Sequence, residues 1–244
     1  MDTGIWATWY NLSDDTRDAY LEWAHGTYLP FLKQLAGYAW VAHYRHEGGG
    51  PKMKRVEETV VGHTDEDIGA GYQYVMLVGA PSAHTFFHPA LSEIELPDSF
   101  RERLALRQGV RTAIFTEEAR VSGPAAAQAS PGSTPGPYIQ MGSFRMRSPE
   151  LEFDLGRWYA QFRLPYMAQM PGCLRTRKLI CVAGWAKHAV LYEFESAEMR
   201  LRHFEEPHES LSLDKTHWSS QITGNTVHTP GSPTIGPRIW PEKT

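Results

Sequence analysis

A single internal repeat constrains this chain more than any other feature of its sequence. Two stretches each carry a tryptophan, a proline and a glycine at steps of seven residues, and the second stretch follows the first by 135 residues. The six residues are Trp23, Pro30, Gly37, Trp158, Pro165 and Gly172. Because the period is about half of the 244 residues, each repeat is a small domain and not a solenoid turn. The spacing predicts a tandem duplication.

Both halves carry the same predicted order of elements. In the first half, runs of β-branched and aromatic residues predict strands over 3–11, 38–46, 71–79 and 112–121. An apolar stripe of helical period predicts a helix over 13–36, which Pro30 should kink because proline cannot donate to the carbonyl four residues back. A second helical region follows Ser82. The order β-α-β-β-α-β is that of a ferredoxin-like unit, so the predicted fold class is α+β, with two such repeats packed sheet to sheet.

Shifts in composition divide the chain into two predicted domains. Residues 1–123 form the first repeat, which we expect to hold the active site, and residues 138–244 form the second. Residues 124–137, rich in Pro, Gly, Ala and Ser, are predicted to be a linker. A charged, Gly-rich insertion over 48–69 is predicted to be a loop. The Pro-rich C-terminal tail is expected to hold a final strand near 221–228 and then an extended segment.

The composition excludes several classes of protein. Hydrophobic residues make up 41% of the chain and charged residues 21%, as in ordinary globular proteins. The formal net charge of −4 argues against nucleic-acid binding, which needs a basic face. No run of about 18 apolar residues occurs, so we expect no membrane span. The start lacks a secretory signal and the only cysteines are Cys173 and Cys181, which favours a reduced, cytoplasmic setting.

The repeated motif resembles a known family. A strand, a helix with Leu29-Pro30 and Leu35-x-Gly37, and then a further strand resemble the EthD-like branch of the dimeric α/β-barrel superfamily. The resemblance covers both halves except the insertion and the tail, and implies that one chain forms the whole barrel. It also implies a cofactor-free cyclase, decarboxylase, isomerase or monooxygenase that acts on aromatic or polyketide-like molecules. Other branches of the superfamily bind haem.

The candidate catalytic residues lie mainly on the first helix. Many EthD-like proteins place a histidine two residues before the helix proline, facing a pocket between helix and sheet, whereas this chain has Tyr28 there in the first half and Arg163 in the second. His25 lies one turn before Tyr28 on the same helix face. Histidine is the commonest general acid–base, and tyrosine can donate to a developing oxyanion, so the pair suits enolisation or elimination. His43 and His88 are further candidates for polarising a substrate oxygen. The open alternative is that His25 and Tyr28 are core side chains.

Aromatic side chains are expected to line the pocket. The predicted lining residues are Trp23, Trp40, Tyr44 and Phe87. Arg175 is a further predicted substrate contact, because it shares a strand face with Arg177 and two guanidinium groups can clamp a carboxylate. If the second half holds the site instead, Arg163, Arg175 and His188 mark it.

No metal or nucleotide site is predicted. His84 and His88 have a chelating i, i+4 spacing, but no acidic third ligand is adjacent. Nucleotide-binding and serine-hydrolase motifs do not occur either.

These observations lead to three functional hypotheses. The first is a cofactor-independent lyase, decarboxylase, isomerase or cyclase that uses general acid–base catalysis on a small aromatic molecule. The second is a haem-dependent enzyme of the same superfamily, with His188 or His203 as the axial ligand. The third is a non-catalytic binding or stress-responsive module, because a fold alone does not imply catalysis. Pairing of two chains into a homodimer stays open.

Overall fold

The structure, a computed structural model, describes residues 2–128 and 135–242 of the chain. The first half follows the predicted alternation of strands and helices, with one added helix and one added short strand. Its elements are β1 (Gly4–Asn11), α1 (Arg17–Trp23), the π-helix η1 (Ala24–Tyr28), α2 (Leu29–Gln34), β2 (Trp40–Arg45), α3 (Pro51–Thr59), β3 (Gly62–His63), β4 (Tyr74–Ala80), the 3-10 helices η2 (Ala83–Phe86) and η3 (Leu91–Glu93), α4 (Asp98–Leu104) and β5 (Gln108–Ser122).

The second half repeats this alternation after a 3-10 helix, η4 (Pro124–Gln128), in the predicted linker. Its elements are β6 (Tyr138–Met146), α5 (Leu151–Trp158), the π-helix η5 (Tyr159–Arg163), α6 (Leu164–Met167), β7 (Cys173–Ala183), β8 (His188–Phe194), α7 (Ala197–Met199), the π-helix η6 (Arg200–Glu209), α8 (Ser210–Leu213), α9 (Trp218–Gly224), β9 (Thr226–His228) and β10 (Thr234–Trp240).

The strands form one sheet that closes on itself. Its order is β10-β2-β4-β1-β5-β7-β8-β6-β9-β3, and a pairing of β10 with β6 closes the first eight strands into an antiparallel barrel. When the short strands β3 and β9 are left out, each half contributes four strands to the sheet. Their order is β5-β1-β4-β2 in the first half and β10-β6-β8-β7 in the second, which is fourth, first, third and second along the chain in both. The barrel therefore consists of two four-stranded sheets, joined where β5 meets β7 and where β10 meets β2. The predicted α+β barrel is confirmed at this level.

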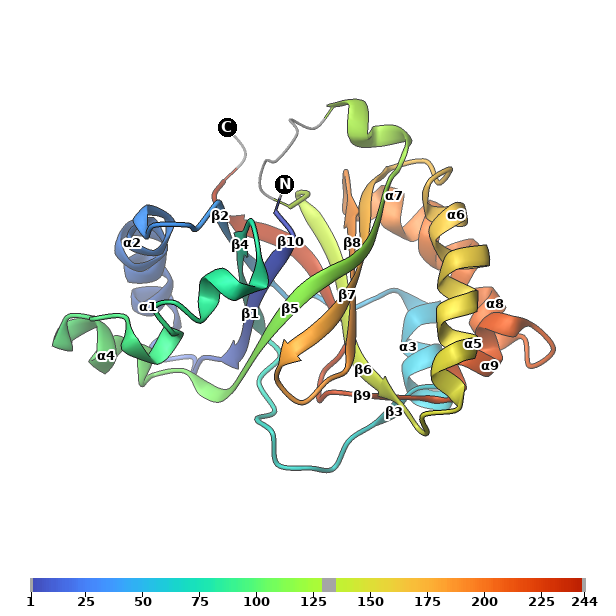
Figure 1. Cartoon of the computed structure of the whole chain (residues 1–244), viewed down its shortest axis with the longest axis horizontal. Coiled ribbons are helices and arrows are strands. Elements are labelled where there is room, and N and C mark those ends of the chain that lie inside the picture. Colours follow the sequence, from blue (N-terminus) through green and yellow to red (C-terminus); the bar gives the residue numbers. More distant parts are fainter. Residues whose placement is uncertain (1, 129–134, 243–244) are drawn as a thin grey trace.

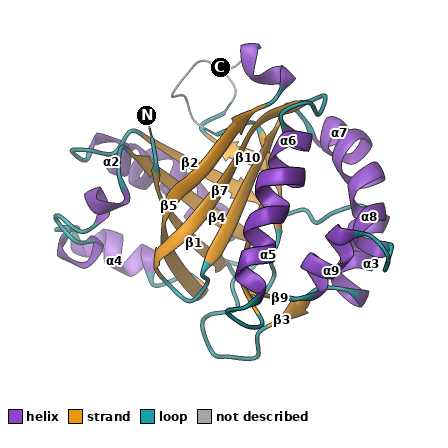
Figure 2. Cartoon of the chain, turned by 45° about the vertical axis from the view of Figure 1, so that its right-hand side comes forward, coloured by secondary structure: helices purple, strands orange, loops and turns teal. Residues whose placement is uncertain are grey.

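Helices cover the outside of the barrel on opposite flanks. Figure 2 shows α2 and α4 on one side of the strands and the helices of the second half on the other, and Figure 1 shows α1 beside α2 and α4. None of the helices in the described residues is long and apolar enough to cross a membrane. Each flank therefore holds a layer of side chains between helices and sheet.

The proline of each repeat follows a π-helical turn. Pro30 and Pro165 are the second residues of α2 and α6, directly after η1 and η5. Proline lacks an N–H and crowds the carbonyl four residues earlier, so the wider π turn accommodates it without ending the helix. Gly37 and Gly172 follow the two helices with φ values of 87° and 78°, a conformation that favours glycine.

The insertion in the first repeat is a helix, and the prediction of a loop there is wrong. It forms α3, which packs against helices of the second half, as Figure 1 shows. The Glu205 carboxylate accepts hydrogen bonds from the backbone N–H groups of Gly50, at 2.8 Å, and Met53, at 3.3 Å. These bonds to a distant segment satisfy the first turn of the helix, and local composition does not reveal them.

The C-terminal tail is also more regular than predicted. Residues 218–224 form α9, and only residues 226–228 of the expected strand are extended. Beyond them β10 pairs with both β2 and β6 and so completes the barrel. Pairing on both sides outweighs the weak strand preference of the prolines and glycines in this segment.

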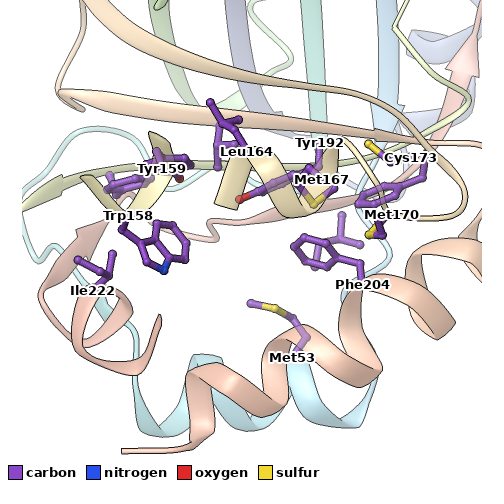
Figure 3. Close-up of a cluster of buried hydrophobic side chains, with 14 of the residues drawn as sticks. Met53, Trp158, Tyr159, Leu164, Met167, Met170, Cys173, Tyr192, Phe204 and Ile222 are labelled. Carbon is purple, nitrogen blue, oxygen red and sulfur yellow. The ribbon is translucent and has the colours of Figure 1, made fainter. Parts of the chain in front are cut away.

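Three apolar clusters correspond to the three layers of the fold. One fills the barrel and includes Trp9 and Phe115. A second lies between the first sheet and its helices, and a third lies between the second sheet and its helices. Figure 3 shows this third cluster, to which α3 of the first half contributes Met53.

A network of buried charges lies inside the barrel beside its apolar cluster. Arg177, which is 0% exposed, pairs with Glu193 at 3.2 Å and with Asp2 at 2.9 Å. Glu193 also binds Arg175 at 3.0 Å. Burial alone would raise the pKa of Asp2, but Arg177 and a hydrogen bond from Trp40 lower it to about 2. The charges thus hold one another in ionised form.

We predict that Glu193→Gln destabilises the protein by about 3 kcal/mol, because it leaves two buried guanidinium groups without their shared carboxylate. Glu47→Gln is the matched control, since Glu47 pairs with Arg45 at 2.6 Å at the surface, and it should cost less than about 0.5 kcal/mol. Urea unfolding of the three proteins measures both values. Equal losses in the two variants would contradict a structural role for the buried network.

Candidate functional site

A cavity lies between the second sheet and its helices. Its volume is about 80 Å³, several times the ~15 Å³ that one water molecule requires. β6 and β8 form its floor, and α3, α5, η5, η6, α8 and α9 form its walls. Aromatic rings dominate the lining, and they come from Phe144, Trp158, Tyr159, Tyr192 and Phe204. Figure 3 shows Met53 of α3 reaching toward Phe204 across this space. Because methionine is flexible, this wall can adapt to a guest.

Arg163 carries a buried positive charge into this cavity. It is the last residue of η5, it is 6% exposed, and it lines the cavity. Its guanidinium carbon lies 4.5 Å from the centre of the Trp158 ring and 5.3 Å from that of Phe204. Among the described residues, the buried Nε and Nη1 atoms have no hydrogen-bond partner, and no carboxylate lies within 4.0 Å of the group. The rings stabilise the cation only in part, so donors remain available for an anionic oxygen.

Two further titratable groups line the same cavity. Burial raises the pKa of Glu209, while Arg163 and Arg200 act in the opposite direction. Glu209 can therefore hold or accept a proton nearer to neutral pH than an exposed glutamate. Burial and the neighbouring His63 lower the pKa of His228 to about 3, so its ring is neutral at pH 7. The cavity thus combines the cation of Arg163 with a glutamate of raised pKa, Glu209, and a neutral imidazole, His228.

The first helix layer holds a different arrangement around the predicted catalytic residues. His25 Nε2 lies 2.9 Å from His43 Nδ1, and His43 Nε2 lies 2.8 Å from the hydroxyl of Tyr10. His25 lies on an open groove of about 700 Å³, whereas His43 is 0% exposed. Burial lowers the pKa of both histidines, and the pKa of His43 most. The structure therefore brings two predicted residues together in a hydrogen-bonded chain.

Tyr28, the other predicted residue of this helix, is part of a packed aromatic cluster. Its ring stacks on Trp23 at 5.4 Å, and the guanidinium of Arg107 lies 5.3 Å from it. Burial raises the pKa of Tyr28, with Arg107 opposing the shift. The position that holds a cavity-lining arginine in the second half thus holds a packed tyrosine in the first.

The remaining predicted site residues lie away from this helix layer. Trp40 and Tyr44 point into the barrel, because alternate residues of β2 face opposite sides and His43 faces the helices. The prediction that they share a pocket with His43 is therefore corrected. Arg175 belongs to the buried ion network of the barrel, and Phe87 and His88 are exposed beyond η2.

The fit of a haem group can be judged from the same geometry. Pockets for drug-sized ligands enclose about 300–1,000 Å³, so the 80 Å³ cavity does not fit a porphyrin. His188 Nε2 is hydrogen-bonded to the Glu152 carboxylate at 2.5 Å, and His203 is half-buried on η6 and does not line the cavity. Within the described residues, no cluster of three His, Cys, Asp or Glu side chains could hold a metal ion.

Sequence reasoning did not find Glu209, His228 or His208. All three lie on η6 and β9, far along the chain from the helix motif. Glu209 and His228 reach the cavity only when the barrel has folded. A signal for Arg163 was present, because it occupies the motif position two residues before the proline.

No family model matches the sequence, and no curated protein matches it. Solved structures do share its fold. A protein assigned as a monooxygenase from Fusobacterium nucleatum aligns over 98% of this chain and 93% of its own length, with a TM-score of 0.61 and 8% identity. An anthrone oxidase-like protein aligns over 97% and 90%, with a TM-score of 0.53 and 11% identity. A dye-decolorizing protein from V. cholerae aligns over 97% and 94%, with a TM-score of 0.53 and 8% identity.

These similarities concern the fold alone, since the identities are low. Together with the strand order, they place the chain among proteins with the dimeric α/β-barrel fold. Here one chain supplies both four-stranded sheets of the barrel.

We predict that His208→Phe makes the stability of the protein less dependent on pH. His208 is 0% exposed and packs on Tyr166 at 4.2 Å, and burial holds its pKa far below the ordinary value of 6.5. Below pH 6.5 the unfolded chain therefore binds a proton that the folded chain does not, so stability falls as pH falls, by about 1.4 kcal/mol per pH unit. In urea unfolding between pH 6 and 4, the variant should lose the part of the slope that His208 contributes. His88→Gln, an exposed control, should keep it, and identical slopes in His208→Phe and the parent would contradict the prediction.

Proposed function

We propose that the protein is a cofactor-independent enzyme that binds a small aromatic anion in the second-half cavity and moves a proton on it. One observation carries the proposal, namely the Arg163 guanidinium among aromatic rings, with two buried nitrogen atoms that bind no described residue. Leaving a buried charge unpaired costs several kcal/mol, and an anionic ligand would remove that cost. The ring-lined walls suit a flat, apolar body attached to the anionic group. Because 80 Å³ is less than the ~150 Å³ of a cavity that holds benzene, binding would require the flexible side chain of Met53 to move aside.

The proposed chemistry follows from the groups that line the cavity. Arg163 would bind a carboxylate, or an enolate oxygen as charge develops on it. Glu209, whose pKa is raised by burial, would deliver or remove the proton. This division of roles suits a decarboxylase, another lyase or an isomerase. A Soret band in the purified protein would favour the haem alternative instead.

A second candidate site rests on the chain His25–His43–Tyr10. Its hydrogen bonds of 2.9 and 2.8 Å connect the groove to a buried phenol and would support proton transfer from a ligand in the groove. In this site His25 would keep its predicted acid–base role. His43, which was predicted to polarise a substrate oxygen, is fully buried and would instead relay the proton to Tyr10.

We also infer that the two halves descend from one ancestral βαββαβ unit, and the EthD-like branch stays a prediction. The common strand order supports this origin, as do the matching π turns before Pro30 and Pro165. The final glycines of the two helices, Gly37 and Gly172, add the same positive φ in each half.

We predict that benzoate binds the protein and that Arg163→Met abolishes this binding. Methionine fills a similar space without charge, so the variant should also have a higher melting temperature in the absence of ligand. Arg157→Met is the matched control, because Arg157 is an exposed cation on the preceding helix, 65% exposed, and this variant should bind benzoate as the parent does. Calorimetric titration and thermal unfolding measure both effects. Unchanged benzoate affinity in Arg163→Met, or no binding by the parent at millimolar concentrations, would refute the proposal.

We predict that proton transfer depends on Glu209 and not on His25. The protein is incubated in heavy water with a panel of hydroxybenzoates and aromatic 2-oxo acids, and NMR follows deuterium incorporation and loss of carbon dioxide. Glu209→Gln should remove this activity while benzoate affinity stays within about threefold, because the neutral amide keeps the shape but cannot exchange a proton. His25→Ala should leave it intact. The opposite pattern, with no loss of melting temperature in His25→Ala, would move the active site to the first half.

A further inference from the structure

His228 lies on the cavity floor at some distance from Arg163. It is the last residue of β9 and is paired with Phe144 of β6, on whose ring it stacks at 5.2 Å. The side chain lines the cavity, and its Cε1 lies 3.8 Å from where a Cβ of Gly142 would be. Because residue 142 is a glycine, the floor beside the imidazole stays open.

The hydrogen bonds of Ser232 determine which nitrogen of His228 carries the proton. Ser232 Oγ accepts a hydrogen bond from the backbone N–H of Ser143 at 3.0 Å and lies 3.1 Å from His228 Nδ1. A hydroxyl that already accepts still has its own proton to donate, and His228 Nδ1 is its only acceptor among the described residues. This arrangement favours Nδ1 as the acceptor, with the proton of the neutral ring on Nε2. Nε2 has no hydrogen-bond partner among the described residues.

The two donor groups lie near different residues of β6. The Arg163 guanidinium lies 5.6 Å from the ring of Tyr192, which is paired with Gln140, whereas the His228 ring lies near Gly142. Two residues along a strand span about 7 Å. One aromatic ring with substituents at opposite ends has a similar length.

We propose that His228 Nε2–H is a second ligand-binding donor and that the substrate carries an uncharged oxygen at the end opposite its anionic group. The proposal rests on the proposed function, because Arg163 would hold the anionic end. A neutral imidazole N–H matches a hydroxyl or carbonyl oxygen, and it cannot compensate a second carboxylate in this buried setting. The substrate class is therefore a para-oxygenated aromatic acid, with 4-hydroxybenzoate as its simplest representative.

The test compares ligands that differ only at the far end. In the parent protein, 4-hydroxybenzoate should bind about tenfold more tightly than 4-methylbenzoate, whose methyl group has the same size but cannot accept a hydrogen bond. Terephthalate, with a second carboxylate, should bind more weakly than both. In His228→Phe, which keeps a ring to stack on Phe144, the preference for 4-hydroxybenzoate should disappear while 4-methylbenzoate binds as before.

A ligand-free measurement tests the position of the proton. In ¹⁵N NMR spectra at pH 7, Nδ1 of His228 should show an unprotonated, pyridine-type signal, and Ser232→Ala should weaken this preference. A protonated Nδ1 in the parent would overturn the inference.

The outcomes separate this inference from the proposed function. Binding of all three ligands with equal preference in the parent and in His228→Phe would overturn the role of His228 and leave that of Arg163 intact. Failure of the parent to bind any of them would overturn the proposed function and this inference together.

Discussion

Closure of the barrel is the constraint on which the rest of the structure depends. Each four-stranded sheet completes the hydrogen bonds of its edges only by pairing with the other, through β5 with β7 and through β10 with β2. The inner faces then bury an apolar cluster and a network of paired charges. Only the outer faces remain to be covered by helices. The cavity that we propose as the ligand site lies between the second sheet and its helices.

The two helix layers show how one framework yields a packed core on one side and a cavity on the other. Both helices pass through a π turn before their proline, so both turn the residue at the same motif position toward the sheet. In the first half this residue is Tyr28, and its phenol, together with Trp23 and Arg107, fills the layer with stacked rings. In the second half it is Arg163, whose guanidinium lines a cavity instead of a filled layer. A cation that lies among aromatic faces, with no carboxylate of the described residues within 4.0 Å, is a costly choice for stability alone, and it is understandable as a binding group.

Sequence patterns predicted the strands well where local residue preferences are enough to determine the structure. The strands of the first half were predicted over 3–11, 38–46, 71–79 and 112–121, and they occur at Gly4–Asn11, Trp40–Arg45, Tyr74–Ala80 and Gln108–Ser122. The helix α3 and the strand β10 were missed, because both are stabilised by partners far away in the chain and their own composition favours loops. One error was avoidable. The two-residue period of a strand already separates Trp40 and Tyr44 from His43, so they could not have lined one pocket.

The cavity itself required both halves, which explains why neither repeat considered alone could reveal it. Its floor and most of its walls belong to the second repeat, but Met53 and Val56 of α3 close one side, and α3 comes from the first. Glu205 binds the start of this helix and is itself held by Arg200 at 2.7 Å, which in turn donates to Gln140 on the cavity floor. These contacts therefore connect the second sheet, through η6, to α3, the helix that closes one side of the cavity. A loss of symmetry between the repeats is the expected consequence, because a segment that covers one site cannot at the same time cover the other.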